Sequence, residues 1–313
     1  MKAESIFEGK GRQGREVEPL RDAATVILVR GPSEGPFELF LMRRHRNQAF
    51  MGGAFVFPGG RLDGADSDPG LGDWVGGLSP ADARNRLQEP ELSEAAALGL
   101  FMAAIRETFE EAGVLLARDE EGRPVDLADS ATAARFSVYR PELHEGRLTL
   151  AEVARREGIR YAPDLLVPYS HWITPTIEPR RFDTRFFLAA LPAGQIPDHD
   201  RMELTESRWM TPAAALAEHH AGRIVLMPPT LKTVEELHAF SSTGRLFAAV
   251  HSRRLDPILP EVFLTADSFG ILLPNDPEYT LSASGQPARP GETTRIVMEG
   301  GIWRTRFTSC SRP

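Results

Sequence analysis

The sequence contains very little cysteine. Its one cysteine, Cys310, cannot form a disulfide within the chain, and a lone thiolate cannot build a cysteine metal site. We therefore expect Cys310 to be an inert residue, and the chain to be a cytoplasmic protein rather than a secreted module held together by disulfides.

Long apolar runs and an excess of basic residues are also missing. The longest apolar stretch, 95–105, reaches only about half a membrane span and contains Gly99. Residues 1–21 lack the apolar run of a signal peptide. The 36 basic residues against 44 acidic ones give a net charge of −8, which works against binding an extended phosphate backbone. We expect neither a membrane protein nor a general nucleic-acid binder.

The chain has enough apolar residues, 42%, to build a sizeable core, and their spacing predicts alternating strands and helices. Two runs separated by a Gly- and Pro-rich turn predict a hairpin, and a third run ends at Pro58-Gly59-Gly60. The predicted strands are 23–30, 38–43, 54–57, 171–174, 181–189, 206–210, 269–273 and 294–298; the predicted helices are 80–87, 91–112, 149–157, 212–219 and 229–240.

These elements predict three parts of the chain. Residues 1–20 are a polar tail, and 21–240 form the main domain, with charged, loop-rich insertions near 67–92 and 118–165. Residues 241–313 form a C-terminal extension that we expect to fold back on the main domain.

The helix over 91–112 carries the strongest candidate for chemistry. At 100° per residue its apolar side chains share one face, whereas Glu107, Glu110 and Glu111 share the other. Their mutual repulsion requires a cation, and Arg106 can reach Glu110 but cannot neutralise all three. Three convergent carboxylates suit Mg²⁺ or Mn²⁺, although a solvated acidic face is the commoner outcome of such a pattern.

The neighbouring residues decide between these interpretations through a resemblance to a known family. Arg-Glu-Thr-Phe-Glu-Glu-Ala-Gly-Val, 106–114, resembles the second half of the Nudix box, and Val-Phe-Pro-Gly-Gly-Arg-Leu-Asp, 56–63, resembles the strand and loop that open it. The two halves are separated by far more residues than the family signature allows. The first acidic position of the box is therefore left open between Asp66, Glu94 and a vacancy.

The resemblance implies the fold class, the site and its cofactor. The fold would be an α/β/α sandwich on a mixed sheet. Glu107, Glu110 and Glu111 would hold Mg²⁺ or Mn²⁺ together with the Gly60 carbonyl, and Arg106 would orient the glutamates. The residues expected to bind substrate are Gly59, Gly60, Arg44, Arg181 and Phe50, and the candidates for a general base are a helix glutamate, Glu178, Glu203 and Glu206.

A branch of this family that resembles coenzyme A diphosphatases is similar to this chain over most of 22–240. Arg43, Arg44 and Arg46 partly match the basic motif of that branch. The resemblance implies a pyrophosphohydrolase with a nucleotide-type small molecule as substrate, first coenzyme A or acyl-coenzyme A, and it leaves a homodimer open. The alternatives are a pyrophosphatase for ADP-ribose, NADH or nucleotide sugars, and a nucleotide sensor that uses the same fold without hydrolysis.

Three further features have simpler interpretations. The adjacent His219 and His220 point to different sides of a helix, so a structural role is expected rather than metal binding. Trp209 is interpreted as a packing residue. Arg180, next to a predicted strand, is a weaker candidate for a phosphate contact.

Overall fold

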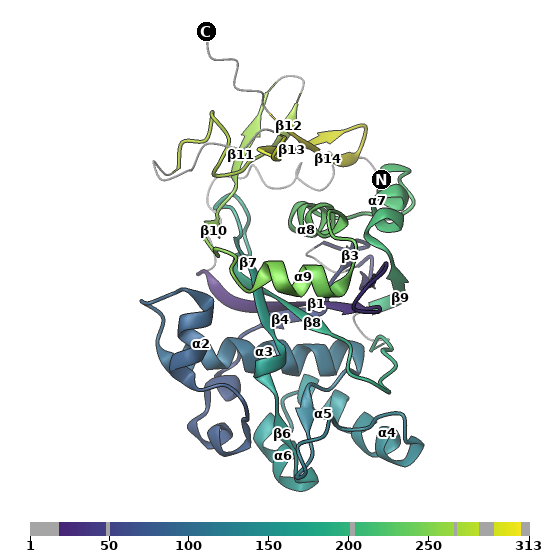
Figure 1. Cartoon of the computed structure of the whole chain (residues 1–313). Coiled ribbons are helices and arrows are strands. Elements are labelled where there is room, and N and C mark those ends of the chain that lie inside the picture. The colour runs from purple at the N-terminus through teal and green to yellow at the C-terminus, as the bar shows by residue number, and fades with distance from the viewer. Residues whose placement is uncertain (1–18, 48–50, 201–203, 266–267, 282–290, 308–313) are drawn as a thin grey trace.

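The central feature is a mixed eight-stranded sheet with helices on both faces (Figure 1), seen in a computed structural model that describes residues 19–47, 51–200, 204–265, 268–281 and 291–307. The strands run in the order β10-β7-β8-β1-β2-β3, with β4 paired to β1 and β9 paired to β2. The pairs β1·β8 and β10·β7 are parallel and the others are antiparallel. The strands are β1 (Arg21–Arg30), β2 (Glu38–Arg44), β3 (Phe55–Val56), β4 (Gly59–Arg61), β7 (Val167–Ile173), β8 (Phe182–Ala190), β9 (Leu204–Met210) and β10 (Pro257–Ile258).

The longest helix, α3 (Glu94–Ala112), lies on one face of the sheet and is surrounded by the two insertions (Figure 1). The helices α8 (Pro228–His238) and α9 (Thr243–Val250) cover the other face, with α7 (Pro212–His220) beside them. This arrangement is the predicted α/β/α sandwich. The insertions contain η1 (Gly64–Ser67), η2 (Pro69–Trp74), α2 (Pro80–Leu87), β5 (Ala117–Arg118), α4 (Ser130–Ser137), α5 (Tyr139–His144), α6 (Leu150–Glu157), β6 (Arg160–Tyr161) and η3 (Pro163–Leu165).

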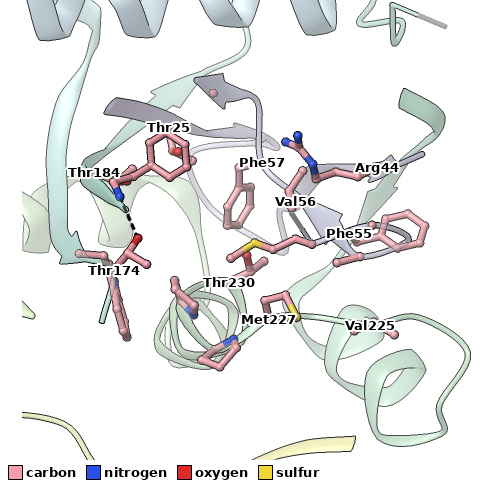
Figure 2. Close-up of a pocket in the computed structure, with 18 of the residues that line it drawn as sticks. Thr25, Arg44, Phe55, Val56, Phe57, Thr174, Thr184, Val225, Met227 and Thr230 are labelled. Carbon is pink, nitrogen blue, oxygen red and sulfur yellow. Dashed lines mark hydrogen bonds between the residues drawn. The ribbon is translucent and has the colours of Figure 1, made fainter. Parts of the chain in front are cut away.

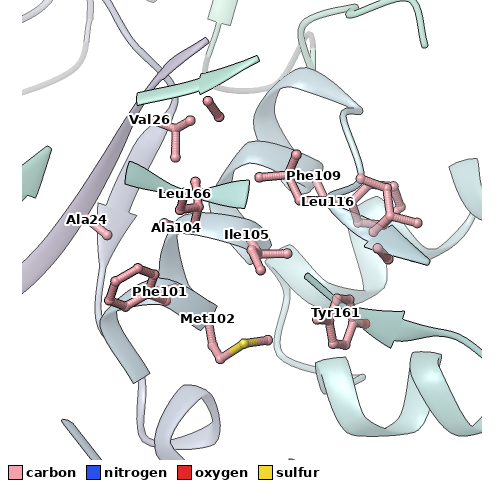
Figure 3. Packing of buried hydrophobic residues seen from close by; sticks show 14 of the residues in the cluster. Ala24, Val26, Phe101, Met102, Ala104, Ile105, Phe109, Leu116, Tyr161 and Leu166 are labelled. Atoms are coloured by element: carbon pink, nitrogen blue, oxygen red, sulfur yellow. The ribbon is translucent and has the colours of Figure 1, made fainter. Parts of the chain in front are cut away.

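Strand β1 is buried on both faces because its residues alternate between two cores. Ala24, Val26 and Leu28 belong to the cluster that contains α3, whereas Ile27 and Val29 belong to the cluster that contains α8. Figure 3 shows the first cluster, in which the side chains of β1 and α3 meet. Each fully buried aliphatic or aromatic side chain contributes about 1.5–3 kcal/mol, so these two cores hold the three layers together.

Helix α3 has a defined start and stop. The Ser93 side chain accepts a hydrogen bond from the Ala96 N–H, so the helix begins at Glu94 and not at the predicted 91. Gly113 ends it in the left-handed conformation, with φ of 67°, as expected for a C-terminal stop. The other predicted helices and strands are confirmed to within a few residues of their bounds.

The run predicted at 54–57 ends before Pro58-Gly59-Gly60 as expected, but the chain continues directly into another strand. Gly59 and Gly60 lie in β4, paired with Thr25 and Ala24 of β1. A side chain at Gly59 would come within 2.4 Å of the Ala24 carbonyl, so the missing Cβ lets the strands approach. The glycine segment is therefore part of the sheet.

The chain after α9 returns to the main domain. Strand β10 pairs with β7, and a second, four-stranded antiparallel sheet follows. Its inner side chains, such as Ile296 and Trp303, belong to the same core cluster as α7 and α8. The layers of the main domain therefore continue past the predicted boundary at 240. The strands of this second sheet, called here the C-terminal sheet, are β11 (Glu261–Leu264), β12 (Phe269–Leu272), β13 (Arg295–Glu299) and β14 (Ile302–Arg306).

Among the residues described, no helix is both long enough and apolar enough to cross a membrane.

Candidate functional site

The site begins where β4 passes the C-terminal half of α3. The Gly59 N–H donates a hydrogen bond of 2.8 Å to Oε2 of Glu111. Gly60 lies directly against Glu107, because a Cβ on Gly60 would be 2.3 Å from Oε1 of that side chain. Glycine at both positions allows the two predicted halves of the motif to meet.

Arg106 connects the carboxylates. Its Nε and Nη2 donate to the two oxygens of Asp66 at 2.9 and 3.0 Å, and its Nη1 donates to Glu107 at 2.9 Å and to Glu110 at 3.2 Å. The predicted contact between Arg106 and Glu110 is confirmed. Burial alone would lower the pKa of Arg106, but Glu107, Asp66 and Glu110 raise it above its usual value. The guanidinium is therefore permanently charged.

The structure separates Asp66 and Glu94, two of the alternatives for the first acidic position of the box. Asp66 is 3% exposed and forms a forked pair with Arg106. Glu94 lies at the first turn of α3, where it pairs with Arg84 at the surface. Asp66 is thus the acid that joins the site, and Glu94 does not.

Glu110 and Glu111 are buried, and Glu107 is mostly buried. Burial raises the pKa of Glu107 and of Glu110 to about 7, in each case against the opposing effect of Arg106. Burial and the charge of Glu107 raise the pKa of Glu111. The alternative interpretation, a solvated acidic face, does not fit this burial. Buried acids held near neutral pH are typical of functional sites.

The second insertion contacts the same end of α3. Arg140 of α5 donates from Nε to the Glu110 carbonyl at 3.0 Å and from Nη2 to the Glu111 carbonyl at 3.2 Å. His144 of the same helix has its Nδ1 3.6 Å from Oε2 of Glu110. Sequence reasoning missed both residues, because nothing in the pattern of 118–165 connects them to α3.

The first insertion is fixed near the other end of α3. Glu89, in the loop between α2 and α3, accepts from Nε of Arg185 at 2.9 Å. Arg185 is 4% exposed and also pairs with Asp22 and Asp183, and Asp183 in turn contacts His171. This network ties the loop before α3 to strands β1, β7 and β8.

The donor set fits a hard divalent cation. Carboxylate oxygens are the ligands that Mg²⁺ and Mn²⁺ prefer, and the space that a Cβ on Gly60 would fill adjoins Glu107. In the arrangement described, no group of three or more His, Cys, Asp or Glu side chains among the described residues converges on one point. In this arrangement Arg106 engages Glu107 and Glu110, and the Gly59 N–H engages Glu111. The metal-ligand assignment stays a prediction.

A cavity of about 1550 Å³ adjoins the glutamates. It exceeds the roughly 300–1,000 Å³ of ordinary ligand pockets. It is lined by Gly59, Gly60, Glu107, Glu110 and Glu111 among others. Figure 2 shows its middle part, from Arg44 on β2 to Met227 and Thr230, with strands of the C-terminal sheet beyond them.

The remaining predicted residues are placed as follows. Arg44 lines the cavity together with Arg43 and Arg46. Arg180 also lines it, whereas Arg181 does not; the Nε of Arg181 donates to the Thr174 carbonyl at 3.1 Å.

Phe50, Glu203 and Cys310 lie outside the described residues. Of the other predicted loop acids, Glu178 lines the cavity and Glu206 pairs with Arg43 at 3.5 Å.

The structural interpretations of His219 and Trp209 are confirmed. His219 is 1% exposed, and its ring contacts the Trp303 carbonyl through Nε2 and the Leu226 N–H through Nδ1. Burial lowers its pKa. The Trp209 ring packs 5.2 Å from Phe40, and the Arg30 guanidinium lies 4.3 Å from its centre.

Comparisons with known proteins find relatives in sequence and in fold. The family model for the NUDT19 Nudix domain matches residues 20–237. The acyl-coenzyme A diphosphatase NUDT19 of Homo sapiens is 30% identical over 307 residues, covering 83% of this chain and 80% of its own length. The protein of the same name from Gallus gallus is 31% identical over 318 residues, covering 83% and 81%. The crystal structure of a NUDIX hydrolase from Alicyclobacillus acidocaldarius is 25% identical with a TM-score of 0.58, covering 74% of this chain and 97% of that one.

Proposed function

This chain belongs to the Nudix hydrolases, in the family of the NUDT19 Nudix domain, and from that membership we propose that it splits the diphosphate of coenzyme A and acyl-coenzyme A. It is a hydrolase of pyrophosphate bonds. The substrate is inferred from the activity for which the human and chicken relatives are named. The products would be an adenosine phosphate and a phosphorylated pantetheine arm that keeps any acyl group.

The observation that carries the proposal is the joint lining of one cavity by acids and arginines. The buried glutamates of α3 and the Gly59–Gly60 strand meet there with Arg43, Arg44 and Arg46 from the end of β2 and the loop after it. Arginines bind phosphate oxygens through forked hydrogen bonds. A polyphosphate could therefore lie with one end against the arginines and its anhydride bond at the glutamates.

We assign Glu107, Glu110, Glu111 and the Gly60 carbonyl to a divalent cation, with Mg²⁺ or Mn²⁺ as the ion. When bound, such a cation offsets the charge on the phosphate oxygens and lowers the pKa of the attacking water. The protein's own residues position these groups. Arg106 holds Glu107 and Glu110 from one side, and the Gly59 N–H fixes Oε2 of Glu111 from the other.

A proton must also leave the attacking water. Glu178 lines the cavity and is one candidate to accept it, whereas Glu206 does not line the cavity and pairs with Arg43 and Arg208. A helix glutamate not fully used by the cation is the second candidate.

The experiment that tests the function is a substrate panel. Purified protein is incubated with coenzyme A, acyl-coenzyme A, ADP-ribose, NADH and nucleotide sugars, with Mg²⁺ or Mn²⁺, and the products are separated by chromatography. We expect turnover of the coenzyme A species in preference to the others. Preference for ADP-ribose, NADH or a nucleotide sugar would contradict the substrate, and binding without turnover of any compound would favour the sensor.

Two expectations from the sequence accompany this proposal. The scarcity of cysteine supports a cytoplasmic location. A homodimer is compatible with the family, and size-exclusion chromatography with light scattering would measure it.

A further inference from the structure

The far wall of the cavity has a uniform chemistry. Every cavity-lining residue described after position 240 is apolar or glycine. Most come from the C-terminal sheet, which lies outside the residues matched by the family model. The apolar side chains that line this wall are Pro260, Val262, Phe269, Ile271, Met298, Ile302 and Trp303.

The side of the cavity near this wall is largely apolar. Ile224 and Met227 line it from the segment between α7 and α8, and Trp172 and Phe186 line it from the main sheet. Arg223, the charged lining residue nearest to them in the chain, is paired with Glu218 at 2.8 Å. Glu178 and Arg180 also line the cavity, from the loop between β7 and β8, but most charged lining residues belong to β1, β2, β4, α3 and the loops beside them. One end of the cavity is therefore mainly charged and the other mainly apolar.

The two ends are well separated. Figure 1 places α3 and the C-terminal sheet on opposite sides of the main sheet, with α8 between the two sheets. A helix is about 10 Å across and packed layers are about 10 Å apart, so the C-terminal sheet lies on the order of 20 Å from the main sheet. A ligand that reaches both ends must be long, with charge at one end and apolar carbon at the other.

We propose that the C-terminal sheet binds the acyl chain of acyl-coenzyme A, which lies between β11–β14 and the α7–α8 segment while the diphosphate lies at the glutamates. The proposal rests on the proposed function and adds a part of the substrate to it. The pantetheine arm separates diphosphate from acyl group and spans the middle of the cavity. Burial of apolar carbon is favourable, so affinity should rise with chain length until the pocket is full.

The test compares Val262→Asp with Leu264→Asp. Both residues lie on β11, an edge strand of the C-terminal sheet. Val262 is half-buried and lines the cavity, whereas Leu264 is 78% exposed and does not. Isothermal titration calorimetry measures the binding of coenzyme A and dodecanoyl-coenzyme A, chromatography follows their hydrolysis, and thermal unfolding checks the fold of each variant.

We expect the wild type and Leu264→Asp to bind dodecanoyl-coenzyme A at least tenfold more tightly than coenzyme A, and Val262→Asp to lose this preference. The proposal of an acyl pocket would be overturned if the wild type bound both compounds with equal affinity. It would also be overturned if both variants lost the preference for dodecanoyl-coenzyme A equally. If Val262→Asp unfolds, a wild-type series from acetyl- to palmitoyl-coenzyme A decides, because a flat series contradicts the proposal.

The two proposals fail in different ways. If the protein hydrolyses coenzyme A but shows no preference for acyl-coenzyme A, the proposed function is supported and the acyl pocket is contradicted. Acyl preference in binding that depends on Val262, without hydrolysis of either compound, would support the pocket and contradict the enzyme activity.

Discussion

Arg106 is the residue on which the arrangement of the acids depends. It is nearly buried and hydrogen-bonds to Asp66, Glu107 and Glu110 at once. The sequence places it correctly beside Glu107 but does not show that three carboxylates share it. A single buried cation among several buried acids is costly to remove, because each acid left behind lacks its partner.

Arg106→Ala should therefore destabilise the protein strongly. We expect a loss of roughly 3–5 kcal/mol in the free energy of unfolding, the cost of breaking a buried ion pair. Urea denaturation followed by circular dichroism measures it. The matched control is Arg84→Ala, which removes a surface pair with Glu94 and should cost about 1 kcal/mol or less. Similar losses in both variants would show that the buried network does not carry stability.

Glu111→Gln should separate chemistry from folding. The amide oxygen can still accept the Gly59 N–H, so the fold should be kept. As a proposed metal ligand, the lost carboxylate should reduce kcat by roughly 100-fold or more, since the charge stabilisation it supports is worth several kcal/mol. Steady-state kinetics with coenzyme A and Mg²⁺ measure this. Glu94→Gln on the same helix should keep its turnover, and near-normal turnover by Glu111→Gln would remove Glu111 from the site.

At the scale of elements, the approach of β4 to α3 decides the geometry of the site. The strand pairs with β1 through Gly59 and Gly60, and the side chain of Glu107 occupies the space beside Gly60. The glycines matter here for their missing side chains rather than for a turn.

Gly60→Ala should displace Glu107, because the added methyl would lie 2.3 Å from its Oε1. A shift of about 1 Å at a catalytic group can cost 100-fold in rate, so we expect a loss of that order in kcat/KM. Gly64→Ala is the control, since nothing lies within 4 Å of a Cβ there. A crystal structure of each variant would show whether Glu107 moves, and unchanged turnover by Gly60→Ala would contradict this account.

Most of the secondary structure could be predicted because local signals determine it. Gly113 marks the predicted end of α3, and a run of β-branched and aliphatic residues marks β1, which is buried on both faces. The partners of the site could not be predicted in the same way. Asp66 and Arg106 are forty residues apart, and Arg140 reaches α3 from an insertion whose sequence resembles any charged surface segment. Long-range contacts of this kind depend on packing, which periodicity does not encode.

At the scale of the whole molecule, the buried acids couple stability to pH. Glu107 and Glu110 have pKa values of about 7 in the folded chain, against 4.5 as the ordinary value. Between these values the folded state binds more protons than the unfolded state. The contribution of these groups to stability is therefore greatest below about pH 4.5 and decreases as the pH rises towards 7.

Mg²⁺ should restore the stability that is lost as the pH rises, because a cation binds the ionised carboxylates and displaces their protons. We expect millimolar Mg²⁺ to raise Tm more at pH 8 than at pH 6, measured by differential scanning calorimetry at constant ionic strength. A Glu107→Gln/Glu110→Gln variant serves as the control, and its Tm should depend little on Mg²⁺ or on pH. An equal shift at both pH values would mean that the cation does not bind these acids.

The catalytic helix is tied to the rest of the molecule near both ends, by Glu89 through Arg185 and by Arg140 through the carbonyls of Glu110 and Glu111. The position of the short motif thus depends on segments outside it. Grafting 56–63 and 106–114 onto another scaffold would transfer the acids without the segments that hold the helix in position. A related protein with either insertion shortened would need other contacts to fix this helix.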